Sequence, residues 1–442
     1  MCVSTPFFRT ILAASALALA TPQNSYAQKA ETGPFATPLR VFSAVEQTKF
    51  NAGFALFRDA WVVEKVGWIS NPLVASTDTG LPGIGPLYNQ NACSACHVGN
   101  ARGAAPAEGE AIRLMVVRLS VDGTSEHGGP RPHPVYGGQL NPQGIAGVPG
   151  EGDAVLHYET RPVTLAGGES VELRAPKIAF RGLNYGPIAP DTKISVRNAP
   201  PVAGLGLLAQ VPENALRDIA KQNGGKLNHV WDLETGKTVL GRFGWKANQP
   251  SIAQQMANAF SEDMGVNSRL FPRENCTGAQ TACLIKTAES VFTELPEREF
   301  ESVVFYLANL APPPRREADT LQARAGAKVF AQLGCGQCHR EKLPLANGGA
   351  IAPYTDLALH DMGGGLADGR PDYEAGPRDW RTPPLWGLGS ASENAQFLHD
   401  GRARSFAEAI LWHGGQAEHA AKAYQALPKP QRDDLGAFLN SL

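Results

Sequence analysis

The chain lacks the features of a nucleic-acid-binding or membrane-spanning protein. Its 40 Lys and Arg residues are offset by 42 Asp and Glu residues, so the net charge is -2. A protein that neutralises a phosphate backbone carries an excess of basic residues. No stretch approaches the roughly 20 consecutive apolar residues that a transmembrane helix needs. We therefore expect no nucleic acid partner and no membrane span.

Cysteine is also scarce, yet four of its 7 occurrences fall in two copies of one short pattern. Residues 93–97 and 335–339 both read Cys-x-x-Cys-His. Two thiols three positions apart can bond to both vinyl groups of one porphyrin, and the adjacent imidazole then lies under the iron. A redox Cys-x-x-Cys and half of a zinc site are the competing interpretations. Because both copies are complete in a chain with so few cysteines, we predict two covalent haems c. The residues that would hold them are Cys93, Cys96, His97, Cys335, Cys338 and His339.

The first residues have the composition of an export signal. Arg9 precedes an apolar run over residues 11–20, and Ser25-Tyr26-Ala27 offers the small residues of a cleavage site. The run is too short to span a bilayer. We expect a signal peptide over residues 1–27, cleaved after Ala27, and a mature protein in the bacterial periplasm.

Two cysteines are left once the haem cysteines and Cys2 of the signal peptide are set aside. Cys276 and Cys283 lie close together in the sequence, and such a pair in an exported protein is typical of a short-loop disulfide. Two free thiols are the alternative. A disulfide and haem c both agree with an oxidising compartment.

The C-terminal third has the pattern of a small class I cytochrome c. Apolar residues recur at helical spacing over residues 318–333, directly before Cys335, and again over residues 430–442. Two such helices crossing beside a haem form the core of that fold. We place this domain at residues 314–442, with the linker marked by the proline run that starts at Pro312.

The preceding domain, residues 28–313, is predicted to repeat this plan around a large insertion. Residues 50–64 and 297–311 would form its opening and closing helices. Residues 114–121 and 155–175 show the β-branched alternation that is typical of strands, interrupted by glycine-rich turns. The expected fold is therefore mainly α, with two cytochrome c-type haem domains and a β-rich insertion in the first.

Four further stretches, at residues 241–251, 354–363, 380–386 and 397–402, carry a resemblance to a known family. With the haem motifs they are similar to the bacterial di-haem oxidoreductases, some of which are labelled thiol oxidoreductases. That family resembles the di-haem cytochrome c peroxidases, in which an N-terminal haem reacts with peroxide and a C-terminal haem takes electrons from a carrier. The resemblance implies a small periplasmic electron-carrier protein as partner, and peroxide or another small oxidant as substrate.

The resemblance also implies a second iron ligand for the C-terminal haem. In the peroxidases, the residue fourteen positions after the His of a His-Asp-Gly motif is the sixth ligand, commonly Met. Here that His is His399, and the ligand position holds His413. Residues 405–412 also look helical, and His413 ends this helix before two glycines. Interaction with the helix dipole is the alternative role for His413, and His399 is expected to have a supporting role.

For the N-terminal haem, the peroxidases place a Trp between the haems, a Gln ten residues later, and an acid just before a Met-Gly turn. Trp245, Gln255 and Asp263 match this pattern, with a slightly shorter gap before the acid. The implied roles are electron relay for Trp245 and positioning and proton transfer for the other two. Glu262 is the neighbouring candidate for the acid. A core tryptophan and a solvated carboxylate are the alternative interpretations.

One departure from the peroxidase pattern concerns the distal side of the N-terminal haem. The peroxidases often carry a removable distal His soon after the first haem motif, but no His occurs here between His97 and His127. We therefore expect this haem to be open. Met115 and Met264 are runner-up ligands, although a lone Met more often fills a core. The sequence leaves the roles of His360 and Met362 open.

The expected function is that of a periplasmic di-haem oxidoreductase of the peroxidase type. A pure electron carrier with two six-coordinate irons is the alternative from another class. An oxygenase or a maturation-type oxidase is a third, because related scaffolds host those chemistries. The sequence leaves the substrate, the donor, the oligomeric state and calcium binding between the domains open.

Overall fold

The computed structural model describes residues 1, 33–63, 81–288, 293–390 and 396–442. Within it, Glu31–Leu442 is one compact unit. The expected signal peptide lies outside the described residues except for Met1, so its cleavage stays a prediction. The domain division after residue 313 also stays a prediction.

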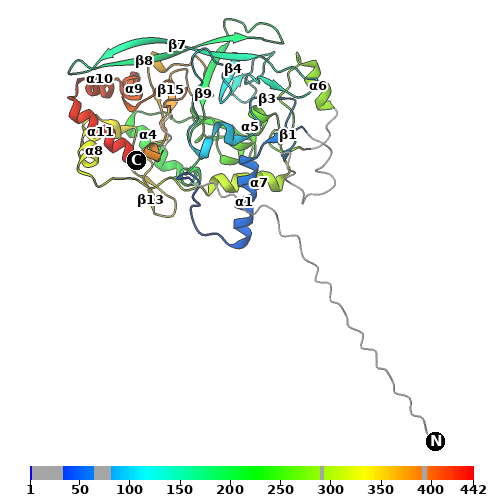
Figure 1. Ribbon diagram of the computed structural model, residues 1–442, viewed down its shortest axis with the longest axis horizontal. Coiled ribbons are helices and arrows are strands. Elements are labelled where there is room, and N and C mark those ends of the chain that lie inside the picture. The colour runs from blue at the N-terminus through cyan, green and yellow to red at the C-terminus, as the bar shows by residue number, and fades with distance from the viewer. Residues whose placement is uncertain (2–32, 64–80, 289–292, 391–395) are drawn as a thin grey trace. The chain divides into compact units, whose positions relative to one another are not determined.

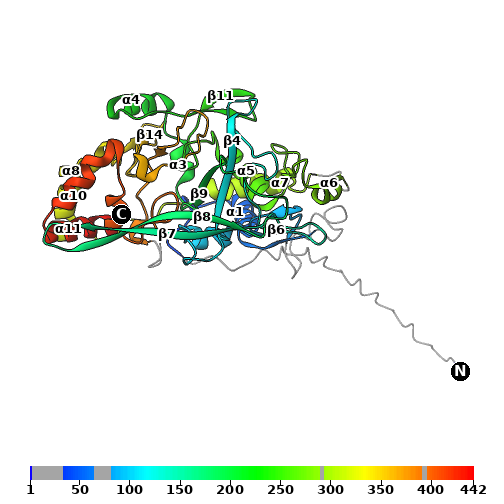
Figure 2. The same cartoon turned by 90° about the horizontal axis from the view of Figure 1, so that it is seen from above.

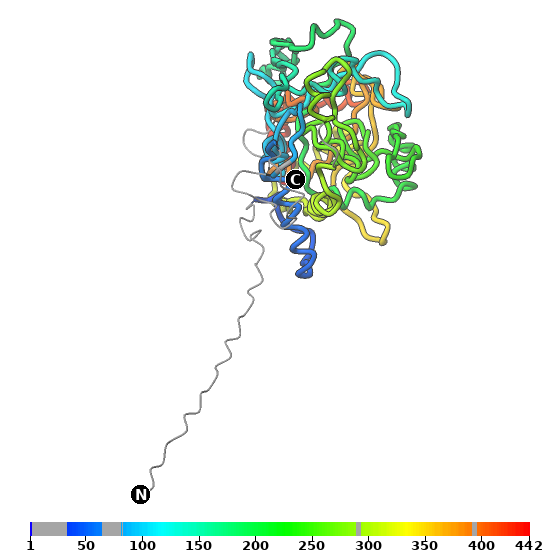
Figure 3. Tube along the Cα trace, turned by 90° about the vertical axis from the view of Figure 1, so that its right-hand side faces the viewer, coloured from blue at the N-terminus to red at the C-terminus, as the bar shows by residue number. Residues whose placement is uncertain are grey.

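A pair of packed helices opens and closes the part of the chain that carries the first haem motif. Helix α1 (Ala44–Arg58) begins at a capping box formed by Ser43 and Glu46. It packs against α7 (Glu297–Ala308), and Figure 3 shows the two side by side. The helices touch closely at Gly53, where a Cβ would overlap the Ser302 carbonyl. The closing helix is confirmed, whereas the opening helix starts earlier than expected and ends at Arg58.

The C-terminal helices are confirmed. Helix α8 (Leu321–Gln332) begins at Thr320, whose side chain accepts a hydrogen bond from the Ala323 amide. It packs against α11 (Lys429–Ser441). Gly326 permits this approach, because a Cβ there would overlap the Asp434 carbonyl. Two shorter helices, α9 (Phe406–Leu411) and α10 (Glu418–Ala426), lie between them in the sequence.

The predicted strands are present and longer than expected. Strand β4 (Met115–Thr124) pairs antiparallel with β9 (Lys193–Asn198) and with β5 (Pro130–Arg131). Strands β7 (Asp153–Thr164) and β8 (Ser170–Arg181) form a long antiparallel hairpin. Figures 1 and 2 show this hairpin running from the neighbourhood of β4 and β6 to helices α10 and α11.

The hairpin binds the C-terminal helices at its tip. Gln425 of α10 donates from Nε2 to the Thr164 carbonyl at 2.8 Å. Arg432 of α11 forms an ion pair of 2.6 Å with Glu169 in the turn. The insertion in the first half of the chain is therefore packed against the second haem motif's own helices.

The expectation of a mainly α fold is wrong. The chain is 32% helical and 21% strand, with several small sheets. The helices that flank the haem motifs dominated the prediction, but the β7–β8 hairpin, the β5–β4–β9 sheet and several short strand pairs add a substantial strand content. These pairs are β1 (Trp61–Val62) with β2 (Leu81–Pro82), β3 (Leu87–Tyr88) with β6 (Gln143–Gly144), β10 (His229–Asp232) with β11 (Lys237–Leu240), β12 (Leu343–Pro344) with β13 (Ala350–Ile351), and β14 (Leu359–Asp361) with β15 (Asp379–Arg381).

The other α-helices of the described residues are α2 (Cys93–Cys96), α3 (Leu205–Ala209), α4 (Glu213–Asn223), α5 (Ile252–Met264) and α6 (Thr281–Ala288). In the parts of the chain that the structure describes, no helix has both the length and the apolar character needed to cross a membrane. Cys276 and Cys283 are joined as a disulfide, with their Cα atoms 5.8 Å apart.

Candidate haem sites

Each Cys-x-x-Cys-His motif lines its own cavity. The N-terminal cavity, of about 210 Å³, is bordered by Cys93, Cys96 and His97. The C-terminal cavity, of about 240 Å³, is bordered by Cys335, Cys338 and His339. Most of the surface of both cavities is apolar, as a porphyrin requires.

The C-terminal cavity holds two imidazoles that face each other. The ring centroids of His339 and His413 are 6.5 Å apart. His339 donates from Nδ1 to the Tyr354 carbonyl at 3.1 Å, and His413 donates from Nδ1 to the Ala409 carbonyl at 2.7 Å. These hydrogen bonds leave Nε2 of each ring free to bind a metal. Two metal–nitrogen bonds of about 2 Å, with about 1 Å from each nitrogen to its ring centre, give about 6 Å, so one iron fits between the rings.

Burial keeps both of these imidazoles neutral, which is the form that ligates a metal. It lowers the pKa of His339 to about 4 and also lowers the pKa of His413. His413 directly follows helix α9 and its cap, Trp412, so the helix fixes the position of the ring. The predicted ligand pair is therefore brought together.

His360 also lines the C-terminal cavity, but both of its ring nitrogens are occupied. Nε2 lies 2.8 Å from Oδ2 of Asp356, and Nδ1 lies 3.2 Å from Oε1 of Gln416. Burial opposes the charged ring, but hydrogen bonds to Asp356 and Cys338 prevail and raise the pKa of His360 to about 10. Cys338, Asp356 and His360 together could hold a metal ion, since their donor atoms lie within 4.8 Å of one another. As an axial haem ligand, however, His360 is poorly placed compared with His413.

His399 supports the wall of the same cavity. Its ring stacks on Trp380 with the centroids 3.6 Å apart, and Nε2 lies 3.4 Å from Oδ2 of Asp400. Burial lowers the pKa of His399 to about 4. Met362, the other residue whose role the sequence left open, also borders this cavity.

The N-terminal cavity differs because His97 is the one histidine among the described residues that line it. His97 donates from Nδ1 to the Pro200 carbonyl at 2.9 Å, which leaves Nε2 free, and burial lowers its pKa to about 4. Met115 and Met264 also border the cavity and are buried. With Met256, which also borders this cavity and is buried, they are the candidates for a sixth ligand on that side.

Helix α5 brings the predicted acid and Gln255 to the N-terminal cavity. Burial raises the pKa of Asp263, which favours a protonated carboxyl group. Asp263 borders the same cavity as the attachment cysteines Cys93 and Cys96. Burial raises the pKa of both thiols to about 12, with a smaller contribution from Asp263. Glu262 does not line the cavity and instead forms an ion pair of 3.3 Å with Arg118. Of the two acids, Asp263 therefore faces the cavity.

Gln139 is a site residue that the sequence did not reveal. Its Nε2 donates to Oδ1 of Asp263 and to the Glu262 carbonyl, both at 2.9 Å. The side chain is buried, so it holds the Asp263 carboxyl group in one orientation. No motif or spacing marks Gln139, because it reaches the acid only through the packing of the β-rich insertion on α5.

Trp245 separates the two cavities and borders both. Its indole Nε1 donates to the Asn198 carbonyl at 2.8 Å, and the Asn198 amide donates to the His399 carbonyl at 2.6 Å. The Trp245 carbonyl accepts from the Arg381 amide at 2.9 Å. The predicted relay is therefore held from both sides.

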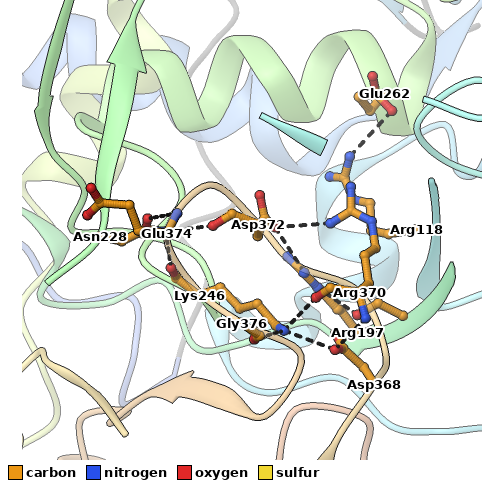
Figure 4. Close-up of polar contacts among 11 residues, drawn as sticks. Arg118, Arg197, Asn228, Lys246, Glu262, Asp368, Arg370, Asp372, Glu374 and Gly376 are labelled. Atoms are coloured by element: carbon orange, nitrogen blue, oxygen red, sulfur yellow. Dashed lines mark hydrogen bonds and ion pairs between the residues drawn. The ribbon is translucent and has the colours of Figure 1, made fainter. Parts of the chain in front are cut away.

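Lys246, the next residue, anchors Trp245 through a buried polar cluster that the sequence did not indicate (Figure 4). Its Nζ lies 2.9 Å from Oδ1 of Asp368, 2.7 Å from the Arg370 carbonyl and 2.9 Å from the Gly376 carbonyl. Burial lowers the pKa of Lys246 to about 8, and Asp368 opposes this shift. The cage of oxygens ties the backbone at Trp245 to the loop after Leu366.

One comparison with known proteins, the match to a family model, indicates a di-haem protein. The family described as "Di-haem oxidoreductase, putative peroxidase" matches residues 24–442. No curated protein sequence matches the chain. Among solved structures, the chain is similar to a hydrazine synthase of Kuenenia stuttgartiensis, with 14% identity, a TM-score of 0.39, and coverage of 98% of this chain and 99% of that chain. It is also similar to a MauG-like protein associated with microbial copper homeostasis, with 15% identity, a TM-score of 0.32, and coverage of 60% and 80%.

Both TM-scores are low, so the assignment rests on the family match, which covers nearly the whole sequence. The residues present fit the cofactor, because each cavity combines two cysteines with at least one neutral imidazole whose Nε2 is free. The chain belongs to the di-haem oxidoreductase family and is a haem-binding enzyme.

Proposed function

We propose that this protein is an exported, periplasmic di-haem c-type oxidoreductase that reduces peroxide or a related small oxidant. The observation that carries the proposal is the unequal histidine content of two cavities that share Trp245. The C-terminal cavity offers two facing imidazoles, whereas the described lining of the N-terminal cavity offers His97 and an acid, Asp263. A six-coordinate iron suits electron transfer, and an open iron suits a reaction with substrate.

Covalent attachment follows from the Cys-x-x-Cys-His motifs. Cys93 and Cys96 would bond one haem, Cys335 and Cys338 the other, and His97, His339 and His413 would bind iron. When bound, the haems supply one-electron chemistry, with electrons from a small periplasmic carrier entering at the C-terminal site and being used at the N-terminal site. The disulfide between Cys276 and Cys283 supports an oxidising compartment.

The residues of the N-terminal cavity would handle the protons of this reaction. Reduction of hydrogen peroxide to two waters consumes two electrons and two protons. The Asp263 carboxylate would accept a proton from one peroxide oxygen and donate it to the other, which promotes cleavage of the O–O bond. Gln139 keeps the carboxyl group oriented, and Gln255 would position the oxidant.

A pure electron carrier is the second candidate, and the buried Met115 and Met264 at the N-terminal cavity favour it. Either thioether on the iron would close the site. The spin state of each haem separates the two functions: electron paramagnetic resonance of the oxidised protein should show one low-spin and one high-spin iron. Two low-spin irons and no reaction with peroxide would overturn the enzymatic proposal in favour of the carrier.

A further inference from the structure

Arg102 is a cation at the boundary between the two cavities that has no anionic partner among the described residues. It follows His97 by five residues and borders both cavities. Its Nη1 atom is buried and makes no hydrogen bond, and no ion pair involves Arg102 among the described residues. Burial lowers the pKa of Arg102 to about 10, which still leaves the guanidinium charged at neutral pH. A charge buried in this way is costly unless something neutralises it.

Aromatic side chains hold this guanidinium in place without neutralising it. Its central carbon lies 5.8 Å from the centroid of Trp245 and 5.7 Å from that of Phe397. Such contacts orient a cation over a ring face. They leave the five N–H donors of the group available for an anion from the cavities.

The other arginines at the cavities are satisfied. Arg197 forms an ion pair of 3.0 Å with Asp372, and Arg118 forms one with Glu262. Arg381, which also borders both cavities, donates from Nε to the Gly244 carbonyl at 2.8 Å. Among the arginines in the described linings of the two cavities, Arg102 is therefore the one without a hydrogen-bond or ion-pair partner.

We propose that Arg102 binds propionate carboxylates of the haems at the boundary of the two cavities. The inference rests on the proposed function, because it needs a haem in each cavity. Each haem carries two propionates, and a guanidinium binds a carboxylate through two parallel hydrogen bonds. The bound arginine places a positive charge next to Trp245, where it stabilises the reduced form of the irons on both sides.

Replacement of Arg102 by Gln tests this inference in the haem-loaded protein. Spectroelectrochemical titration should show about a tenfold lower Fe(II)/Fe(III) ratio at fixed ambient potential for at least one haem, which is about 59 mV for a one-electron couple. Resonance Raman bands of the propionates should shift as well. Arg161→Gln is the control, because Arg161 is exposed, stacks on Trp412 and borders neither cavity.

Unchanged potentials in Arg102→Gln with both haems bound, or an equal change in Arg161→Gln, would overturn the inference. If Arg102→Gln does not accumulate, Arg102→Lys decides. Lysine keeps the positive charge but cannot donate two parallel hydrogen bonds to a carboxylate. The reduction potentials should therefore stay close to the wild-type values while the propionate bands shift. Unchanged propionate bands would contradict the inference. A haemochrome assay on wild-type protein separates the two proposals, since fewer than two haems per chain would remove the proposed function itself.

Discussion

At the scale of single residues, the chemistry depends on which ring nitrogens and carboxyl oxygens are left free. In His97, His339 and His413, Nδ1 donates a hydrogen bond to a backbone carbonyl, which leaves Nε2 free. In His360, both ring nitrogens form hydrogen bonds with side chains, those of Gln416 and Asp356. The hydrogen bonds therefore distinguish the three histidines expected to bind iron from His360, which is expected to have a supporting role.

His413→Met should raise the reduction potential of the C-terminal haem, because a thioether ligand favours Fe(II) over Fe(III) more than an imidazole does. His413→Ala should abolish the low-spin signal in electron paramagnetic resonance and leave the signal of the N-terminal haem unchanged. If the signal survives in His413→Ala, the assignment of His413 is wrong. His360→Ala is the control and should keep a low-spin signal.

Asp263→Ala should slow the reaction with hydrogen peroxide by about 10²-fold or more, the loss expected for a positioned acid–base group. Stopped-flow spectroscopy measures this rate, and the haem content and the potential of the C-terminal haem should not change. Glu262→Ala is the matched control, since Glu262 lies outside the cavity and pairs with Arg118. A greater loss in Glu262→Ala than in Asp263→Ala would reverse the two roles.

At the scale of helices and strands, close backbone contacts and buried hydrogen bonds fix how the elements meet. Helices α8 and α11 cross where Gly326 faces the Asp434 carbonyl. The loop held by the disulfide positions Gln280, which donates to the buried carboxyl group of Glu151. Both contacts join segments far apart in the sequence.

Gly326→Ala should destabilise the protein by about 1–3 kcal/mol, because the added Cβ overlaps backbone atoms that cannot move independently. Gly436→Ala on α11 is the control, since a Cβ there meets nothing within 4 Å. It should be neutral or stabilise the helix by up to about 1 kcal/mol. Urea unfolding measures both, and equal effects would contradict the observed crossing.

Glu151 should make stability depend on pH. Burial raises its pKa from 4.5 to about 8, so the folded protein holds this proton more tightly than the unfolded chain. The stability contributed is complete below about pH 4.5 and is lost as the pH rises through about 8. Glu151→Gln should remove this loss, which is about 2–3 kcal/mol between pH 6 and 9 in urea unfolding. Glu159→Gln is the control: Glu159 lies on the exposed part of β7, so this variant should lose stability with rising pH as the wild-type protein does.

At the scale of the whole molecule, the two haem motifs meet at one shared wall. Trp245 and Arg102 border both cavities, and Lys246 ties this wall to the loop after Leu366. The β7–β8 hairpin connects the same two regions on the outside. Communication between the cavities is therefore expected to depend on Trp245.

Trp245→Phe should slow electron transfer between the haems more than it slows the first encounter with peroxide. Phe keeps an aromatic ring but loses the indole N–H that binds the Asn198 carbonyl, and it is harder to oxidise. Pre-steady-state reduction of each haem by a small carrier separates the two steps. Equal slowing of both would mean that Trp245 is a structural residue alone.

The sequence by itself determined the covalent motifs, the helices that lead into them and the family. The reason is that haem attachment and helix formation depend on residues a few positions apart, as in 93–97, 318–333 and 335–339. Family motifs also placed Trp245, Gln255, Asp263 and His413 as candidates, each of which borders a cavity.

Only the tertiary structure decided which of these candidates face each other and what supports them. Gln139 reaches Asp263, and Lys246 reaches Asp368, across more than a hundred residues of sequence. The missing partner of Arg102 is likewise invisible until its surroundings are known. The strand content was underestimated for a similar reason, because long-range pairing and the contact of the β7–β8 hairpin with α10 and α11 depend on packing rather than on local sequence.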